Sequence, residues 1–247
     1  FTTDRLVAMD ILHQPERVII EYNGMWLVSN FEKMQLPTGW GVEQQITCVD
    51  GSTFQMYMAN MKSIFMDMIK NTDMVIFNRC KKEDPLPTYR RGIKVANQRA
   101  EVIFEDEEGE LGDIFQDEMP FDMNAPVIEI LPEDYGIWFV DAMDHPENYE
   151  GKTVKFKARV MKPRGMGSKF FVPGRTAMTC CADDTTFLGY VCKSAYAPKL
   201  TPGEWVEVTA KVGIEKRNEY QGEEGIVLDA EHVEQCDPLE DEMVYFN

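Results

Sequence analysis

The feature that most constrains the fold is a change in the spacing of apolar residues along the chain. Up to residue 104, short apolar runs alternate with longer amphipathic stretches, and after Pro126 strand-like runs follow one another between Gly, Pro and Asn turns. Alternating strands and helices are typical of a parallel sheet with crossover helices, whereas closely spaced short strands are typical of a barrel or sandwich. The chain is therefore predicted to hold two domains of different class.

The first predicted domain, residues 1–125, is α/β. Its expected strands are residues 17–21, 45–49, 74–77 and 101–104, and its expected helices are residues 52–69 and 86–96. The acid-rich stretch that begins at Glu105 is interpreted as a solvated linker, because runs of like charge seldom pack in a core.

The second predicted domain, residues 126–247, is all-β. Five candidate strands cover residues 152–161, 169–181, 186–192, 204–212 and 225–233. Five strands in roughly 100 residues predict a small closed barrel of the OB type.

Charge and hydropathy exclude several partners. The chain has 43 Asp and Glu against 25 Lys and Arg, a formal net charge of −18, and both halves are acidic. Such a charge repels phosphate backbones, so no nucleic-acid partner is expected. The longest apolar runs fall far short of the ~20 residues of a membrane span, so none is expected. Six irregularly spaced cysteines and the lack of a charged-then-apolar leader predict reduced thiols and a cytoplasmic location.

Two of the expected strands end in polar residues. Glu21 and Gly24 follow the apolar run at residues 18–20, and Asn78 and Arg79 follow residues 74–77. The carboxyl ends of parallel strands form the edge at which α/β proteins bind ligands. Each pair alone is a weak indication of a ligand site, because strands often end in polar residues. The order in which the two pairs follow one another along the chain is more informative.

In this order the motifs resemble the CobW-type P-loop GTPases, a family of metal chaperones and metal-insertion GTPases. The resemblance covers roughly residues 15–105. It is carried by residues 18–24 (Val-Ile-Ile-Glu-Tyr-Asn-Gly), 45–50 (Gln-Ile-Thr-Cys-Val-Asp), 72–79 (Thr-Asp-Met-Val-Ile-Phe-Asn-Arg) and 97–100 (Asn-Gln-Arg-Ala).

The resemblance implies a partial P-loop-type parallel sheet with GTP and Mg²⁺ as ligands. Glu21 would be the catalytic residue near Mg²⁺ and the γ-phosphate, and Gly24, Asn78 and Arg79 would bind the nucleotide.

The sequence departs from the family in two places. Lys81 stands where the family has the aspartate that selects guanine, so this contact is absent or supplied elsewhere. The glycine-rich phosphate loop and the Cys-x-Cys-Cys metal motif do not occur in the 247 residues, and they would precede Phe1. Without that loop, efficient GTP hydrolysis is not expected. The alternative is a non-enzymatic adaptor of a permease system that has lost nucleotide binding.

The second half, roughly residues 135–247, resembles the C-terminal domain of YcgQ-type permease subunits. The resemblance is carried by residues 148–154 (Asn-Tyr-Glu-Gly-Lys-Thr-Val), 174–183 (Gly-Arg-Thr-Ala-Met-Thr-Cys-Cys-Ala-Asp) and 202–209 (Pro-Gly-Glu-Trp-Val-Glu-Val-Thr). It implies a permease or metalloprotein partner rather than transport by this chain.

Cys180, Cys181 and Asp183 form the candidate metal site. Tetrahedral Zn²⁺ accepts thiolates and carboxylates together, but neighbouring thiols reach one ion only where the strand bends. The alternative is one buried apolar cysteine beside a surface thiol. Together, the resemblances predict a CobW-like GTP-binding protein of metal homeostasis or metal transport, with a C-terminal barrel for metal or partner binding.

Overall fold

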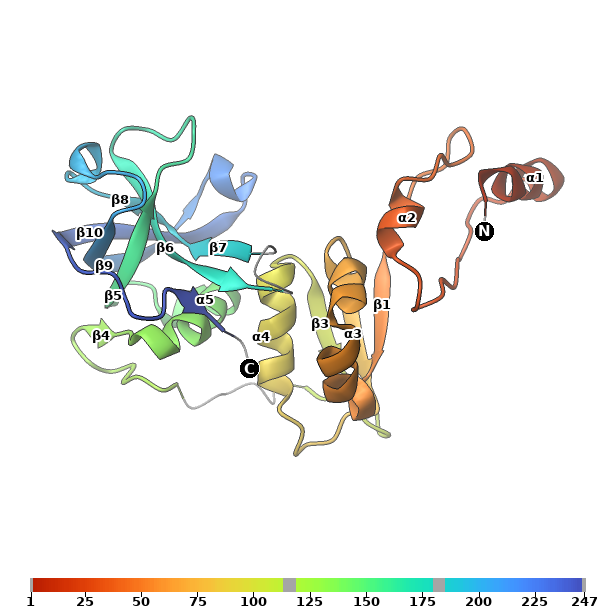
Figure 1. Ribbon diagram of the computed structural model, residues 1–247, viewed down its shortest axis with the longest axis horizontal. Helices are drawn as coiled ribbons and strands as arrows, with labels where there is room; N and C mark the ends of the chain where they lie inside the picture. The colour runs from red at the N-terminus through yellow and green to blue at the C-terminus, as the bar shows by residue number, and fades with distance from the viewer. Residues whose placement is uncertain (1, 113–118, 180–184, 246–247) are drawn as a thin grey trace. The chain divides into compact units, whose positions relative to one another are not determined.

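The computed structural model describes residues 2–112, 119–179 and 185–245, which form two compact units. Unit 1 comprises residues 1–86 and 96–114, and unit 2 comprises residues 87–95 and 115–247. Figure 1 shows the elements of both.

The helices are α1 Thr3–His13, α2 Val28–Glu32, α3 Phe54–Ile69, α4 Leu86–Ala96 and α5 Tyr135–Asp144. The strands are β1 Ile46–Asp50, β2 Met74–Asn78, β3 Glu101–Phe104, β4 Ile128–Glu129, β5 Thr153–Met161, β6 Phe170–Met178, β7 Thr185–Gly189, β8 Val191–Lys193, β9 Trp205–Lys216, β10 Glu224–Gln235 and β11 Met243–Val244. Among the described residues, no helix combines the length and the apolar character that crossing a bilayer demands.

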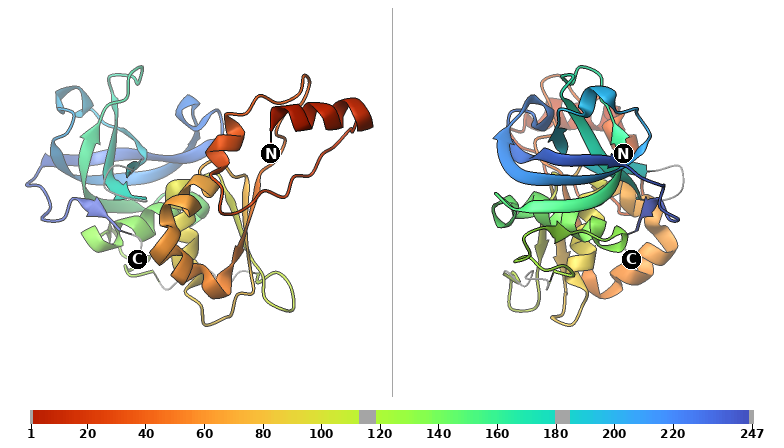
Figure 2. Two further views of the ribbon diagram at one scale, coloured as in Figure 1. Left: turned by 45° about the vertical axis from the view of Figure 1, so that its right-hand side comes forward. Right: turned by 90° about the vertical axis from the view of Figure 1, so that its left-hand side faces the viewer.

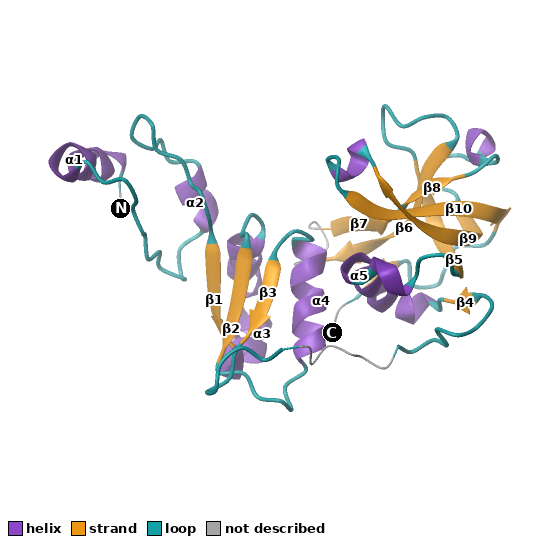
Figure 3. Ribbon diagram, turned by 180° about the vertical axis from the view of Figure 1, so that it is seen from behind, coloured by secondary structure: helices purple, strands orange, loops and turns teal. Residues whose placement is uncertain are grey.

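Unit 1 is built on a three-stranded parallel sheet in the order β1, β2, β3 (Figure 3). Phe77 at the centre of the sheet stacks on Phe104 and meets Phe54 of α3 edge-on, with ring centroids 4.8 and 4.9 Å apart. The expected strands at residues 45–49, 74–77 and 101–104 and both expected helices are confirmed, but residues 87–95 of the second helix belong to unit 2. The sequence periodicity thus identified the part of unit 1 that has a packed core.

The expected strand at residues 17–21 is wrong. These residues adopt no regular structure, and Ile19 is 92% exposed. A strand needs a neighbour for its backbone N–H and C=O groups, and the structure gives β1 one partner, β2. Residues 17–21 pair with no strand among the described residues, so they form no ladder.

Unit 2 is a closed five-stranded barrel, as expected. The ring runs β5, β6, β8, β10, β9 and back to β5; its pairs are antiparallel except for β8 with β10. β5 alternates buried and part-exposed residues along its whole length, which is typical of a barrel wall. The expected run at residues 186–192 is divided between β7 and β8.

Helix α5 lies against one side of the barrel (Figure 2) and contributes its largest core side chain. The Trp138 ring lies 4.8 Å from the Phe156 ring and 5.6 Å from the Tyr190 ring, measured between centroids. Sequence reasoning did not predict this helix. It is apolar on nearly every side, so it lacks the one-sided stripe that marks an amphipathic helix.

Candidate functional site at the carboxyl edge of the parallel sheet

The carboxyl end of β1 leads into a tight turn that starts α3. The Asp50 carboxylate accepts hydrogen bonds from the Ser52 backbone N (3.1 Å) and the Ser52 Oγ (2.6 Å). These bonds cap the turn and lower the pKa of Asp50, with a further lowering by Arg79 that works against partial burial. Asp50 is therefore an anion at the sheet edge at neutral pH.

The neighbouring strand β2 ends at Asn78, and Arg79 follows in the left-handed region with φ of 55°. Arg79 Nη1 lies 2.5 Å from Asp50 Oδ2, so an ion pair joins the ends of two strands. The Arg79 side chain is 71% exposed. An exposed pair of this kind contributes about 0–1 kcal/mol, so Arg79 can exchange this contact for a ligand at little cost.

Gly51 allows the ends of β1 and β2 to approach closely. A Cβ at this position would lie 2.7 Å from Cys80 Sγ and 3.0 Å from the Asn78 carbonyl oxygen. The turn after β1 therefore requires a glycine, and this requirement fixes the spacing between Asp50 and Asn78.

Cys80 lies at the centre of the edge and is buried. Its pKa is raised to about 11, first by burial and then by the charge of Asp84, with smaller contributions from Asp50 and Asp106. The negative charges of all three carboxylates disfavour the thiolate form of Cys80. A thiol with such a pKa is protonated at neutral pH, so Cys80 is neither a nucleophile nor a metal-binding thiolate there.

The Asn78 side chain has an unmet hydrogen-bonding capacity. Its Oδ1 is buried and accepts no hydrogen bond in the described part of the chain. Buried polar atoms are nearly always paired, and an unpaired one can be satisfied by a ligand. Asn78 is therefore the group at this edge that most clearly points to a ligand.

The end of β3 completes the edge. The Cys80 backbone N donates to the Glu105 carbonyl oxygen (2.9 Å), which ties the loop after β2 to the loop after β3. Asp106 Oδ1 accepts from the Glu108 and Gly109 backbone N atoms at 2.7 and 3.2 Å. One carboxylate oxygen of Asp106 is therefore occupied by hydrogen bonds within its own turn.

The predicted residues Glu21 and Gly24 do not lie at a strand end. Both are exposed and belong to the irregular chain between α1 and α2. The Gly24 carbonyl oxygen accepts a hydrogen bond from the Tyr57 hydroxyl of α3 at 3.2 Å. Of the four nucleotide-site predictions, the structure brings only Asn78 and Arg79 together.

The predicted metal ligands Cys180, Cys181 and Asp183 lie outside the described residues. Within the described ranges, no group of three or more His, Cys, Asp or Glu side chains is arranged to hold a metal ion.

Sequence reasoning missed Asp50 and Asp84 as members of the edge. The signal for Asp50 was its place directly before Gly51 and Ser52, where a strand turns into a helix. Asp84 had no comparable signal, because it reaches the edge through a turn that its own side chain closes.

Arg175, which lies in the motif at residues 174–183, has a structural role. It is 2% exposed, and its guanidinium donates to the Pro132 carbonyl oxygen and to those of Asp241 and Met243, the latter two at 3.0 Å. It also lies 5.6 Å from the centroid of the Tyr135 ring. These bonds fasten the chain around β11 to the barrel.

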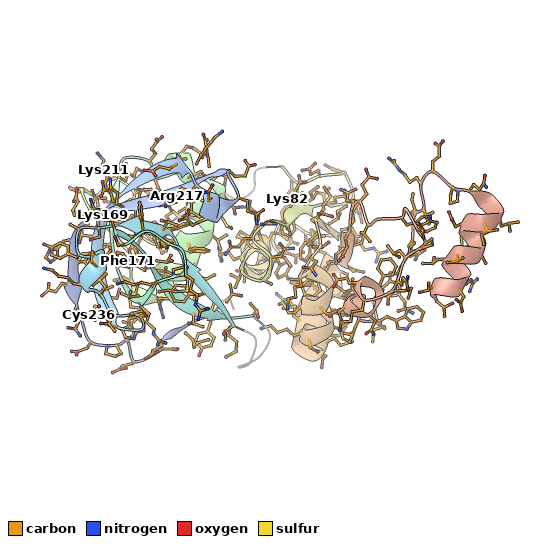
Figure 4. All side chains as sticks on the ribbon, turned by 90° about the horizontal axis from the view of Figure 1, so that it is seen from above. Lys82, Lys169, Phe171, Lys211, Arg217 and Cys236 are labelled. Carbon is orange, nitrogen blue, oxygen red and sulfur yellow. The ribbon has the colours of Figure 1, made fainter. Side chains whose placement is uncertain are left out.

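The outer side of the barrel at β6, β8 and the β9–β10 hairpin is covered by the chain's own residues. The Arg217 guanidinium lies 4.3 Å from the centroid of the Phe170 ring. The Tyr220 hydroxyl donates to the Ile226 carbonyl oxygen and accepts from the Val191 backbone N. Figure 4 labels Arg217 and Lys169 in this unit. No free aromatic platform is formed by these residues.

Two hollows lined by described residues include no residue of this edge. One, of about 470 Å³, is an open depression lined by residues between Tyr22 and Met34 of unit 1. The other, of about 30 Å³, lies between α4 and α5 in unit 2 and is the size of a single water.

Comparisons with known proteins bear on the second unit. No curated protein matches the chain. The mitochondrial single-stranded DNA binding protein Rim1 of S. cerevisiae is 10% identical over 36% of this chain and 97% of its own, with a TM-score of 0.22. The aspartyl-tRNA synthetase of Entamoeba histolytica is 15% identical over 48% of this chain and 27% of its own, with a TM-score of 0.25. TM-scores this low establish no shared fold or function.

The family model for the DUF1980 C-terminal domain matches residues 110–246, more than half of the chain. This domain is of the YcgQ type, which confirms the resemblance of the second half. With its barrel and this match, the chain belongs to the family of the DUF1980 C-terminal domain.

Proposed function

We propose that this protein is a CobW-like GTP-binding protein of metal homeostasis or metal transport, in which unit 1 binds the nucleotide and the barrel engages a metal or a partner. The observation that carries the proposal is the carboxyl edge of β1, β2 and β3. There the buried Oδ1 of Asn78 accepts no hydrogen bond from the described residues, and the neighbouring Arg79 forms an exposed ion pair with Asp50.

The residues at this edge fit contacts to the base of a nucleotide better than contacts to its phosphates. Asn78 would contact the base, and the aliphatic part of Arg79 would pack on the ring. A backbone cradle for phosphates is not formed by the described residues around the edge, and Glu21, the expected Mg²⁺ neighbour, is exposed. We therefore derive no hydrolytic step.

Binding of GTP with Mg²⁺, measured by calorimetry at millimolar nucleotide, tests the proposal. We expect saturable binding that Asn78→Ala weakens about tenfold or more, because the donor of the ligand loses its acceptor, Asn78 Oδ1. Asn60→Ala is the matched control, since Asn60 lies on the exposed side of α3 and bonds only to its own helix. Absence of binding by the folded chain, or equal binding by both variants, contradicts the proposal.

A non-enzymatic adaptor of a permease system is the second candidate. It is favoured by Lys81 at the position of the guanine-reading aspartate and by the exposure of Glu21. Rapid GTP hydrolysis by the purified protein would eliminate it.

For the barrel we propose an OB-like fold and a Zn²⁺ site at Cys180, Cys181 and Asp183. One parallel pair in an otherwise antiparallel ring of five strands supports the OB-like assignment. Zinc content of protein purified without chelator is expected to fall on Cys180→Ser or Cys181→Ser; zinc-free wild-type protein that is fully folded contradicts the site.

Single-stranded nucleic acid is a disfavoured ligand of the barrel. Binding of that kind uses a basic groove with exposed aromatic rings. Here Arg217 covers the Phe170 ring and the Tyr220 hydroxyl is tied to two backbone groups, in a chain with net charge −18.

A further inference from the structure

Exposed apolar side chains are concentrated in the first part of unit 1. Ten of the fifteen exposed large apolar side chains in the described part of the chain precede Thr47. Single exposed apolar residues are ordinary on a protein surface, whereas a concentration of them marks an interaction site. One helix and one hollow carry most of these side chains.

The first feature is the outward side of α1. It carries four exposed apolar residues, here called the α1 stripe, which are Val7, Ala8, Ile11 and Leu12. Residues at this spacing share one side of a helix. The opposite side holds α1 in unit 1, since Leu6 is 2% exposed and Asp10 Oδ1 accepts from Trp40 Nε1 at 3.0 Å. Ile11 and Leu12 are 73% and 75% exposed, so the α1 stripe faces solvent.

The second feature is the open depression of about 470 Å³, here called the Trp26 hollow. It is lined by Tyr22, Met25, Trp26, Leu27, Asn30 and Met34. The Trp26 backbone N donates to the Asn23 carbonyl oxygen at 2.9 Å, and the Tyr57 hydroxyl of α3 donates to the Gly24 carbonyl oxygen at 3.2 Å. The Tyr22 ring meets the Trp26 ring edge-on, with centroids 5.6 Å apart. The hollow is therefore a formed surface that is tied to α3.

The composition of the Trp26 hollow fits apolar side chains of a protein. Residues 22–31 contain no Asp, Glu, Lys or Arg, although 28% of the chain is charged. The cores of protein interfaces are likewise poor in charge and rich in aromatic residues and Met. The flexible side chains of Met25 and Met34 can adapt to an inserted group. An amphipathic helix that docks in a groove presents side chains of this kind.

We propose that the α1 stripe of one copy of this chain docks in the Trp26 hollow of a second copy, which returns the same contact. Both surfaces belong to one chain, so the two equal contacts close a two-fold dimer. Eight exposed large apolar side chains lie between residues 7 and 27, and they offer on the order of 800 Å². One partner contributes about this area to a standard interface, so the region is large enough for a stable dimer.

A lipid surface fits this region less well than a second copy. Helices that lie on membranes are rich in Lys and Arg on their polar side. Helix α1 contains one such residue, Arg5, together with Asp4 and Asp10. Its charges therefore do not favour an anionic membrane.

The molar mass of the whole chain, measured by light scattering at about 10 µM protein, tests the proposal. We expect twice the mass of one chain. Leu12→Lys in the α1 stripe and Met25→Glu in the Trp26 hollow each place a charge in the contact and should weaken dimerisation about thirtyfold or more. Leu131→Lys and Leu131→Glu are the matched controls, since Leu131 is an exposed apolar residue of unit 2, and they should leave the dimer unchanged.

Mixing the two variants distinguishes the proposed contact from other ways of pairing. In a mixed dimer of Leu12→Lys and Met25→Glu, one contact is unchanged and the other holds both substitutions, whose opposite charges attract. The mixture should therefore recover dimers that each variant alone fails to form. If it does not, stripes pair with stripes or hollows with hollows, and the proposed contact is wrong.

Two further results would overturn the proposal. One is a dimer that neither Leu12→Lys nor Met25→Glu weakens. The other is a wild-type chain that is monomeric at this concentration. Co-sedimentation of such a monomer with phosphatidylcholine vesicles would identify a lipid surface as the occupant instead.

Discussion

Arg175 and Asn78 differ in how the hydrogen-bonding capacity of their buried polar atoms is used. Arg175 is buried in unit 2, where its Nη1 and Nη2 atoms donate to three backbone carbonyl oxygens while its Nε has no hydrogen-bond partner among the described residues. Asn78 is at a strand end in unit 1, and its buried Oδ1 accepts no hydrogen bond from the described residues. The first arrangement holds a fold together, and the second leaves a capacity that a ligand can use.

Truncation of Arg175 should be severely destabilising. Arg175→Ala leaves three carbonyl oxygens without their donor and opens a cavity, so we expect a loss of about 3 kcal/mol or more in the free energy of unfolding. Urea unfolding measures this loss. Arg164→Ala, in an exposed loop, should change the free energy by less than about 0.5 kcal/mol. Equal losses in the two variants would show that the buried guanidinium is not a structural anchor.

Asp50 should contribute a pH-dependent part of the stability. The Ser52 hydrogen bonds and Arg79 lower its pKa in the folded protein, so its stabilising effect is present above the pKa of the unfolded chain and is lost as the pH falls through the folded value. The loss thus lies below about pH 4. Urea unfolding of Asp50→Asn from neutral to acid pH should show a shallower fall there than wild type. Asp237→Asn, at an exposed position, is the control, and its stability should fall as steeply as that of wild type. If the stability of Asp50→Asn falls just as steeply, Asp50 does not have this role.

At the scale of elements, the sequence pattern predicts the strands of the parallel sheet in unit 1 well. β1, β2 and β3 lie within one or two residues of their expected bounds, because alternation reflects burial on a sheet. Residues 17–21 carry the same pattern but pair with no described strand, and pairing is not visible in local sequence. Helix α5 was missed for the opposite reason: it is buried on almost all sides, so its sequence has no polar face.

The candidate site was only partly predictable for similar reasons. Asn78 and Arg79 follow a strand directly, so their place at the sheet edge could be inferred from the strand alone. Asp84 reaches that edge through a side-chain bond to Lys81, and Cys80 through packing on Gly51. Contacts that depend on loop geometry are not encoded in residue spacing.

The close approach of β1 and β2 should make Gly51 intolerant of a side chain. Gly51→Ala places a Cβ against Cys80 Sγ and the Asn78 carbonyl oxygen, and we expect a loss of about 1–3 kcal/mol in the free energy of unfolding. Gly24→Ala is the control, since nothing lies within 4 Å of its Cβ position. Urea unfolding that finds Gly51→Ala as stable as Gly24→Ala would show that the turn is not tightly packed.

At the scale of the whole molecule, the family match and the compact unit begin at different places. The match starts at residue 110, whereas unit 2 includes residues 87–95 of α4. From that helix Arg90 and Lys94 lie 3.1 and 3.4 Å from the Asp144 carboxylate, whose side chain is 7% exposed. Val95 of the same helix belongs to the hydrophobic core of unit 2. Helix α4 is thus part of the folding unit that contains the family domain.

A fragment of residues 87–247 should be more stable than one of residues 110–247. Without α4, Asp144 loses both of its cations and the hydrophobic core loses Val95, so we expect the shorter fragment to unfold at a lower temperature and urea concentration. Thermal and urea unfolding of the two fragments measure the difference. Equal stability would mean that the unit ends where the family match begins.

Hydrogen exchange with and without GDP, followed by mass spectrometry on the whole chain, locates a ligand without assuming its affinity. If the carboxyl edge of β1, β2 and β3 reads a guanine base, GDP should slow exchange in peptides covering residues 74–86, and peptides from β5 and β6 should be unchanged. Protection confined to the barrel, or no protection at saturating GDP, would contradict a nucleotide site at this edge.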